Sequence, residues 1–193
     1  MTFQWGQLLI KEASAARIVN QASEALAVVG TRRTEAPRMF HQVFCRSDRV
    51  PTGQDVANWV MDGATFDENP AFNPPFESLT GTGWGAIDVI YDEGRRPLQI
   101  HRETGDECAP HVEAAVTVLR ERGYYREKAE LVAKLRETKQ IFTIEFDEEL
   151  CDDAVWELLD SFEMRLAREF DGITFADDEG FFDGRNQPFV KFS

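Results

Sequence analysis

The sequence contains no apolar run long enough to cross a membrane. Its longest apolar run covers only residues 25–29, whereas a transmembrane helix needs about 20 such residues. The first residues carry no positive charge ahead of an apolar stretch, so no signal peptide is expected. We therefore predict a cytoplasmic protein that does not span a membrane.

Cysteine is also scarce. The three cysteines, Cys45, Cys108 and Cys151, are odd in number and widely spaced. This pattern argues against a disulfide framework, which needs paired cysteines and is typical of secreted proteins. The cysteine content therefore agrees with the reducing environment of the cytoplasm.

Basic residues are few relative to acidic ones. The 193 residues include 21 Lys plus Arg and 35 Asp plus Glu, which gives a net charge of −14. Counted along the sequence, residues 1–61 carry 7 − 5 = +2, residues 62–138 carry 9 − 15 = −6, and residues 139–193 carry 5 − 15 = −10. A field of this sign repels phosphate backbones and anionic lipid. We therefore expect neither nucleic acid nor a membrane surface to be the partner.

Complete catalytic motifs are missing as well. The sequence contains no Gly-x-Ser-x-Gly elbow, no His-Glu-x-x-His pair and no Walker sequence. The glycine-rich segment 81–85 does not fit a phosphate loop, because a strand rather than a helix is expected after it. No cofactor is predicted from these patterns.

The apolar pattern that is present predicts an α+β protein with a mixed or largely antiparallel sheet. Alternating or β-branched segments indicate strands near residues 39–45, 86–91, 97–102, 141–146, 173–176 and 189–192. Apolar residues at helical spacing indicate amphipathic helices over residues 8–29, 53–61, 110–122, 125–137 and 152–169. Segments 86–91 and 97–102 are expected to form a β-hairpin around the turn that begins at Asp92.

The domain organisation has two readings. In one, residues 1–61 form an N-terminal helix and strand segment, residues 62–83 an ordered loop rich in Phe, Pro and Gly, and residues 84–193 the main α+β unit. In the other, the whole chain is one compact domain. Residues 62–66 also resemble residues 171–175 at four of five positions, which is a weak sign of a duplicated strand-helix-strand unit. Ordinary helix-capping chemistry at Asp-Gly explains the same match.

One candidate metal or nucleophile site contains His101, Cys108 and His111. Cys108 and His111, with two residues between them, can share a metal ion, and a thiol at a helix N-terminus is expected to have a lowered pKa. A tetrahedral zinc site needs four ligands, however, and the sequence has no second cysteine pair. The alternative interpretation is a hairpin end that leads into a helix.

Several carboxylates are grouped near the C-terminus. Asp177, Asp178, Glu179 and Asp183 could ligate a divalent ion, but their spacing does not match that of an EF-hand loop. Asp is also common at helix caps and turns, which accounts for these positions without a ligand.

The same carboxylates, together with three phenylalanines, are also candidates for a surface that recognises a protein partner. Phe66, Phe72 and Phe76 supply large rings in the 62–83 loop, and the acidic C-terminal residues supply charge for steering a basic partner. The competing explanation is that the carboxylates keep the surface solvated while the rings hold their own loop to the core.

The leading functional prediction is a non-enzymatic protein-binding module that engages a basic protein, as an inhibitor or antitoxin, a chaperone or an adaptor would. A small metal-dependent hydrolase built on the carboxylates or on the His/Cys group is the alternative. Mimicry of nucleic acid by an array of carboxylates is a third possibility, and it requires a continuous acidic stripe on the folded surface.

Overall fold

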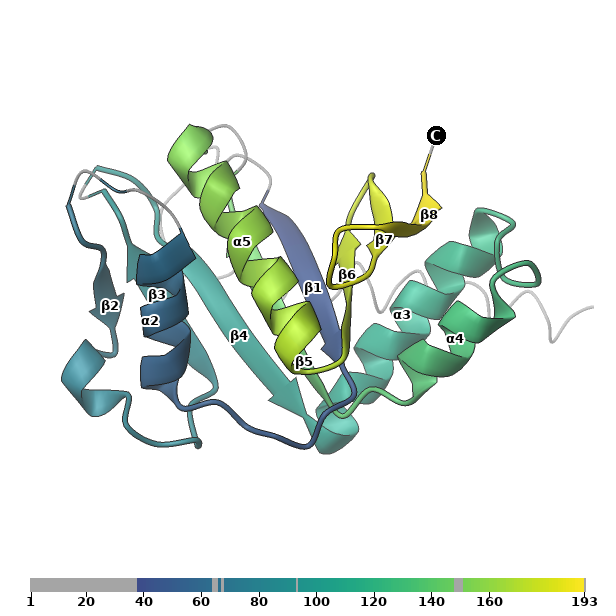
Figure 1. The fold of residues 1–193 in the computed structure, drawn as a ribbon, viewed down its shortest axis with the longest axis horizontal. Helices are drawn as coiled ribbons and strands as arrows, with labels where there is room; N and C mark the ends of the chain where they lie inside the picture. The colour runs from purple at the N-terminus through teal and green to yellow at the C-terminus, as the bar shows by residue number, and fades with distance from the viewer. Residues whose placement is uncertain (1–37, 64–65, 67, 93, 148–150, 193) are drawn as a thin grey trace, which may run out of the picture. The chain divides into compact units, whose positions relative to one another are not determined.

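The computed structural model describes residues 38–63, 66, 68–92, 94–147 and 151–192 (Figure 1). The helix predicted over residues 8–29 lies outside these residues. The elements follow one another as β1 (Met39–Cys45), α2 (Gly53–Gly63), β2 (Ala71–Asn73), the 3-10 turn η1 (Phe76–Ser78), β3 (Ala86–Ile90), β4 (Leu98–Thr104), the 3-10 turn η2 (Gly105–Glu107), α3 (Cys108–Glu121), α4 (Ala129–Arg136), β5 (Gln140–Phe146), α5 (Asp153–Glu169), β6 (Gly172–Ala176), β7 (Gly180–Phe182) and β8 (Pro188–Lys191).

The strands form one 8-stranded sheet in the order β2-β3-β4-β5-β1-β6-β7-β8. Every pairing in it is antiparallel, and β1 lies between β5 and β6. The prediction of an α+β fold with a largely antiparallel sheet is confirmed, as is the hairpin of β3 and β4. Strand β2 was not expected, because three residues that end beside a proline are too few to show a period of two.

Six of the elements make a ferredoxin-like βαββαβ arrangement. In chain order they are β1, α2, β4, β5, α5 and β6, and the sheet places the four strands in the order β4-β5-β1-β6. Helices α3 and α4 are inserted between β4 and β5, and β7 and β8 extend the sheet beyond β6. Strands β5 and β6 therefore run parallel to one another on either side of β1.

The sheet carries a core on each of its two faces. Helices α2 and α5 cover one face, where Val43 and Cys45 of β1 are fully buried with side chains of β3, β4 and β5. Helices α3 and α4 cover part of the other face, where Phe44 packs with side chains of β5 to β8. Successive side chains of a strand point to opposite faces, so β1 contributes to both cores.

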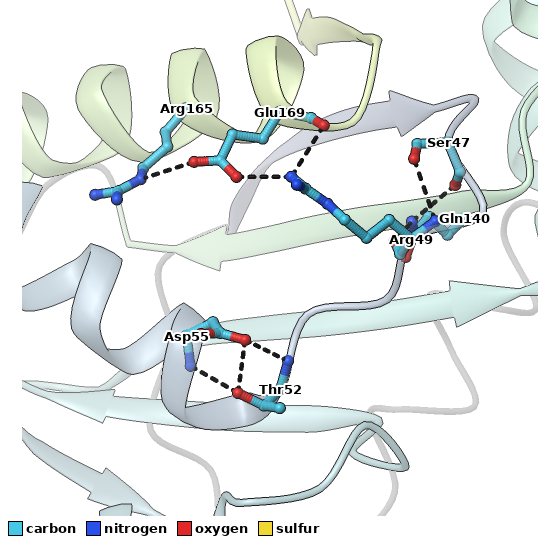
Figure 2. A network of polar contacts seen from close by, with 7 residues as sticks. All are labelled: Ser47, Arg49, Thr52, Asp55, Gln140, Arg165 and Glu169. Carbon is cyan, nitrogen blue, oxygen red and sulfur yellow. Dashed lines mark hydrogen bonds and ion pairs between the residues drawn. The ribbon is translucent and has the colours of Figure 1, made fainter.

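Both helices of the first face have side-chain caps at their N-termini. Asp152 accepts a hydrogen bond from the backbone nitrogen of Val155 at 3.1 Å, at the start of α5. Before α2, Thr52 and Asp55 exchange hydrogen bonds: the Thr52 nitrogen donates to Asp55 at 2.8 Å, and the Asp55 nitrogen donates to Thr52 at 3.1 Å (Figure 2). Such reciprocal caps satisfy backbone N–H groups that the helix itself leaves without a partner.

The turn between β6 and β7 depends on Gly180. This residue has a φ of 138°, and a Cβ atom placed on it would lie 2.1 Å from the backbone oxygen of Val190 in β8. A side chain here is opposed both by the backbone angle and by the neighbouring strand.

We expect Gly180→Ala to lower the free energy of unfolding by about 2–3 kcal/mol, because the strand β8 must move to admit the methyl group. Urea denaturation of the purified variant measures this loss. Gly83→Ala is the matched control, since no heavy atom lies within 4 Å of a Cβ at Gly83. Equal losses in the two variants would contradict the role given to Gly180.

Two sequence-based predictions stay open in this fold. Asp171 has a φ of 52° and lies immediately before β6, whereas Asp62 and Gly63 end α2. Residues 64 and 65 of the first pentapeptide lie outside the described residues, so the duplication remains a prediction. The division at residues 61 and 83 also remains a prediction. Among the described residues, no helix is both long enough and apolar enough to cross a membrane.

Candidate functional site

Acidic side chains from two parts of the chain gather at one end of the sheet. We call this group the acidic edge, and it consists of Asp153, Glu157 and Asp160 of α5 with Asp177, Asp178 and Glu179 of the β6–β7 turn. Strands β5 and β6 both end at this side of the sheet, and α5 starts there and runs back across the face (Figure 1). The topology therefore brings the first half of α5 beside the turn that follows β6.

The three α5 carboxylates lie on one exposed face of the helix. Asp153, Glu157 and Asp160 are all exposed, and their spacing of four and then three residues places them one above another. The opposite face of α5 buries Val155, Leu158 and the other core residues. This stripe is thus separate from the part of the helix that holds the fold together.

Among the residues that the structure describes, most of the acidic edge has no cationic partner. Asp178 lies 3.5 Å from Arg122. The other five carboxylates make no ion pair with another residue that the structure describes. No basic side chain in the described part of the chain therefore offsets their mutual repulsion by an ion pair.

The opposite end of the sheet is charged but paired. Figure 2 shows Glu169, at the end of α5, receiving a hydrogen bond from Arg49 at 2.7 Å and a weaker contact from Arg165 at 3.5 Å. Nearby, Arg46 lies 2.5 Å from Asp171, and Lys139 lies 2.7 Å from Asp48. At this paired edge Arg46, Arg49 and Lys139 each have an acidic partner, whereas five carboxylates of the acidic edge have no basic partner among the described residues.

A buried ion pair lies beneath the acidic edge. His41 of β1 and Glu163 of α5 are 9% and 6% exposed, and Nδ1 of the histidine lies 2.7 Å from the Glu163 carboxylate. The His41 ring also packs edge-on against Phe146 at 5.0 Å between centroids. The pair ties the central strand to the helix that carries the acidic stripe.

The acidic edge influences the protonation of this pair. Burial alone lowers the pKa of His41, but the hydrogen bond to Glu163 and attraction by Glu163, Glu179 and Asp160 outweigh it, so the pKa is raised. Burial has the opposite effect on the acid: it raises the pKa of Glu163, because it disfavours the charged carboxylate. The hydrogen bond and the charge of His41 offset part of that increase. Glu179 and Asp160 thus act on the same histidine from different elements, which places both parts of the acidic edge close to it.

The sheet face away from α2 and α5 carries a row of polar side chains. Asn73, Asp88, Gln99 and Glu145 lie opposite one another on successive strands, and the row ends at Phe40 of β1. Asn73 and Gln99 donate to Asp88 at 2.9 and 2.8 Å, and Arg38 bridges Gln99 and Glu145. Phe40 is 39% exposed, which is unusual for so large an apolar side chain.

The structure separates the predicted phenylalanines from the predicted acidic residues. Phe72 lies in β2, at one edge of the sheet, while Asp177–Glu179 follow β6, five places away in the strand order. At about 4.8 Å per strand this separation is about 24 Å. Phe66, Phe72 and Phe76 are partly buried against the first core, as the alternative interpretation of the rings expects.

Asp183 has a local structural role. Its carboxylate accepts hydrogen bonds from the backbone nitrogens of Arg185 and Gln187, at 2.8 and 2.9 Å. These hydrogen bonds stabilise the conformation of the loop between β7 and β8. We therefore leave Asp183 out of the acidic edge.

The residues of the predicted metal site face different partners. Nε2 of His101 lies 3.7 Å from Glu145, Nδ1 of His111 lies 2.8 Å from the Gln42 amide, and the Cys108 sulfur contacts the backbone oxygen of Glu103 at 3.5 Å. Within the described ranges, no three His, Cys, Asp or Glu side chains are placed to hold a metal ion. The metal-dependent hydrolase remains a prediction that no contact seen here favours.

The expected lowering of the Cys108 pKa is wrong. Burial raises the pKa of this thiol to about 11, and the negative charges of Glu103 and Glu107 add to the effect. The side chain is only 2% exposed. A helix N-terminus favours the thiolate, but here the loss of solvent around the sulfur is the larger effect. Cys108 is therefore a buried residue of the second core.

Sequence reasoning missed two parts of the site. The pairing of His41 with Glu163 joins residues 122 positions apart, and no local pattern indicates it. The stripe on α5 could have been found from its spacing on a helix that the sequence predicts well. Comparison of the chain with models of known protein families, with curated proteins and with solved structures gives no match.

Proposed function

We propose that this protein is a non-enzymatic binding module that engages a basic protein partner, as an inhibitor or antitoxin, a chaperone or an adaptor would. The observation that carries the proposal is the contrast between the two ends of the sheet. Five carboxylates of the acidic edge make no ion pair with a described residue, whereas Arg46, Arg49 and Lys139 of the paired edge each lie in an ion pair. This contrast supports the proposal that the acidic C-terminal region engages the partner.

The same end of the sheet offers apolar side chains for close contact. Phe40 is the second residue of β1 and Ile90 the last of β3, and they are 39% and 36% exposed. Both belong to the sheet face that α2 and α5 leave open, and their strands lie three places apart, or about 15 Å. Charge steers a partner and increases the association rate, while buried aromatic and aliphatic anchors slow its dissociation.

Neutralising the α5 stripe tests the proposal. We expect the triple variant Asp153→Asn, Glu157→Gln, Asp160→Asn to slow association with the basic partner about tenfold at low salt, because the steering field is weakened. A basic protein that is retained from native lysate by the wild type, and then purified, serves as the ligand for stopped-flow or surface-based kinetics.

A matched control removes the same number of charges at the other end of the sheet. Asp106 and Glu107 of η2 and Glu113 of α3 are exposed, and the variant Asp106→Asn, Glu107→Gln, Glu113→Gln, called the α3 control, should associate at the wild-type rate. Equal slowing in both triple variants would show that only net charge matters. Association that does not respond to salt would also contradict an electrostatic role for the acidic edge.

A further inference from the structure

A groove lies beside the acidic edge, between the strands at the far side of the sheet and the start of α5. Its volume is about 990 Å³, and its lining includes Phe66, Ile90 and Tyr91 together with Asp152, the residue that caps α5. Ligand sites in proteins usually have volumes of about 300–1,000 Å³. The groove is therefore large enough for one or two side chains of a partner.

The walls of the groove combine two aromatic rings and an aliphatic side chain with polar and charged residues. The Phe66 and Tyr91 rings lie 6.4 Å apart between centroids, tilted by 32°, and both side chains are half-buried. Ile90 is 36% exposed beside them. Such walls suit a long side chain that has an aliphatic stem and a cationic planar head, because rings attract a cation and also pack against methylene groups.

The rim of the groove carries carboxylates that already hold a guanidinium group. Arg95 lies with Nε 3.2 Å from Asp92 and with Nη1 3.1 Å from Asp152, so it bridges the turn after β3 and the start of α5. The lining contains one further carboxylate, that of the exposed Glu68. Three carboxylates against one arginine leave the lining two negative charges in excess.

We infer that this groove binds an arginine side chain of the basic partner. The inference rests on the proposed function, to which it adds an anchoring position and the identity of the anchoring residue. Arginine fits better than lysine, because its planar head can stack on an aromatic ring while it donates to carboxylates. Asp152 of the groove is adjacent in sequence to Asp153 of the stripe, so one basic segment can contact both.

Short peptides provide the test. The probes are acetyl-Gly-Arg-Gly-Arg-Gly-amide and the same peptide with Lys or with citrulline in place of both Arg residues, titrated into the full-length protein. Methyl NMR signals of Ile90 and Ala154 report the groove, and signals of Ala176 report the other end of the acidic edge. We expect the arginine peptide to shift Ile90 and Ala154 first and to bind several-fold more tightly than the lysine peptide. The citrulline peptide should bind at least tenfold more weakly than the arginine peptide.

Two variants separate this inference from the proposed function. Glu68→Lys reverses an exposed charge on the rim, so the fold should be unaffected, and it should weaken the arginine peptide about tenfold. The α5 triple variant should weaken the arginine and lysine peptides by the same factor, because it lowers the surrounding negative field without changing the groove itself. The inference is overturned if Glu68→Lys has no effect, or if arginine and lysine peptides bind equally with shifts spread over the whole edge. The proposed function would survive either result as long as the α5 variant still slows association with the whole partner.

Discussion

Glu163→Leu is expected to lower the free energy of unfolding by about 3–5 kcal/mol, because it leaves His41 buried without its counter-charge. The wild-type carboxylate lies 2.7 Å from the His41 ring, and both side chains are almost fully buried. Urea denaturation at pH 6 gives the loss directly. The double variant His41→Leu, Glu163→Leu should recover most of it, since a buried ion pair replaced by apolar groups of similar volume is often neutral in stability. A double variant that is as unstable as the sum of both single changes would contradict this account.

The same pair predicts how stability depends on pH. The pKa of His41 is raised above its ordinary value of 6.5, so the folded state holds this proton more tightly than the unfolded state does. The resulting stability is fully present below pH 6.5 and is lost as pH rises through the raised pKa of the folded protein. The raised pKa of Glu163 acts in the same direction. The stability difference between the wild type and Glu163→Leu should therefore shrink as pH rises above 6.5. A difference that grows over that range would contradict the assignment.

Phe142→Ala is expected to cost about 3–5 kcal/mol of folding stability, because it opens a cavity at the centre of the first core. Phe142 of β5 is fully buried, and its ring centroid lies 6.0 Å from that of Trp84 and 5.9 Å from that of Phe170. These partners belong to the segment before β3 and to the end of α5. Removing the ring therefore removes packing contacts between β5, the segment before β3 and the end of α5.

Phe40→Ala is the matched control for this prediction. Phe40 lies on the neighbouring strand β1, but it is 39% exposed on the open face of the sheet. Its removal should change stability by about 1 kcal/mol or less, and the proposed function requires it to speed dissociation of the partner. If Phe40→Ala destabilised the fold as much as Phe142→Ala does, Phe40 would be a core residue and not an anchor for a partner.

Local patterns were sufficient to predict most of the elements. The alternation of residues 141–146 gives β5, and the apolar stripe of α5, with Asp152 as its cap, appears in the structure as the sequence indicates. The apolar residues repeat with the period of a strand in β5 and with the period of a helix in α5, because these are the positions that face the core. Local patterns do not predict the order of the strands in the sheet, because that order depends on contacts between segments that are distant in the sequence.

The candidate site was harder to predict from the sequence, because it also depends on contacts between distant segments. The charge of residues 139–193 is visible by counting, but only the fold shows that Asp160 and Glu179 both act on His41. The sequence also places Cys108 at a helix start without showing that the α3 packing buries its sulfur. The spacing of Phe66, Phe72 and Phe76 gave no sign of which ring would line a groove, and the structure identifies Phe66.

The most direct test of the binding role is the salt dependence of partner association, measured on the wild type and on the two triple variants between about 50 and 300 mM salt. We expect the association rate of the wild type and of the α3 control to fall steeply and in parallel as salt increases, because charges at the interface are screened. The α5 variant should start about tenfold slower and show a much flatter dependence. If all three proteins gave the same slope, the carboxylates of the acidic edge would not be the surface that the basic partner meets.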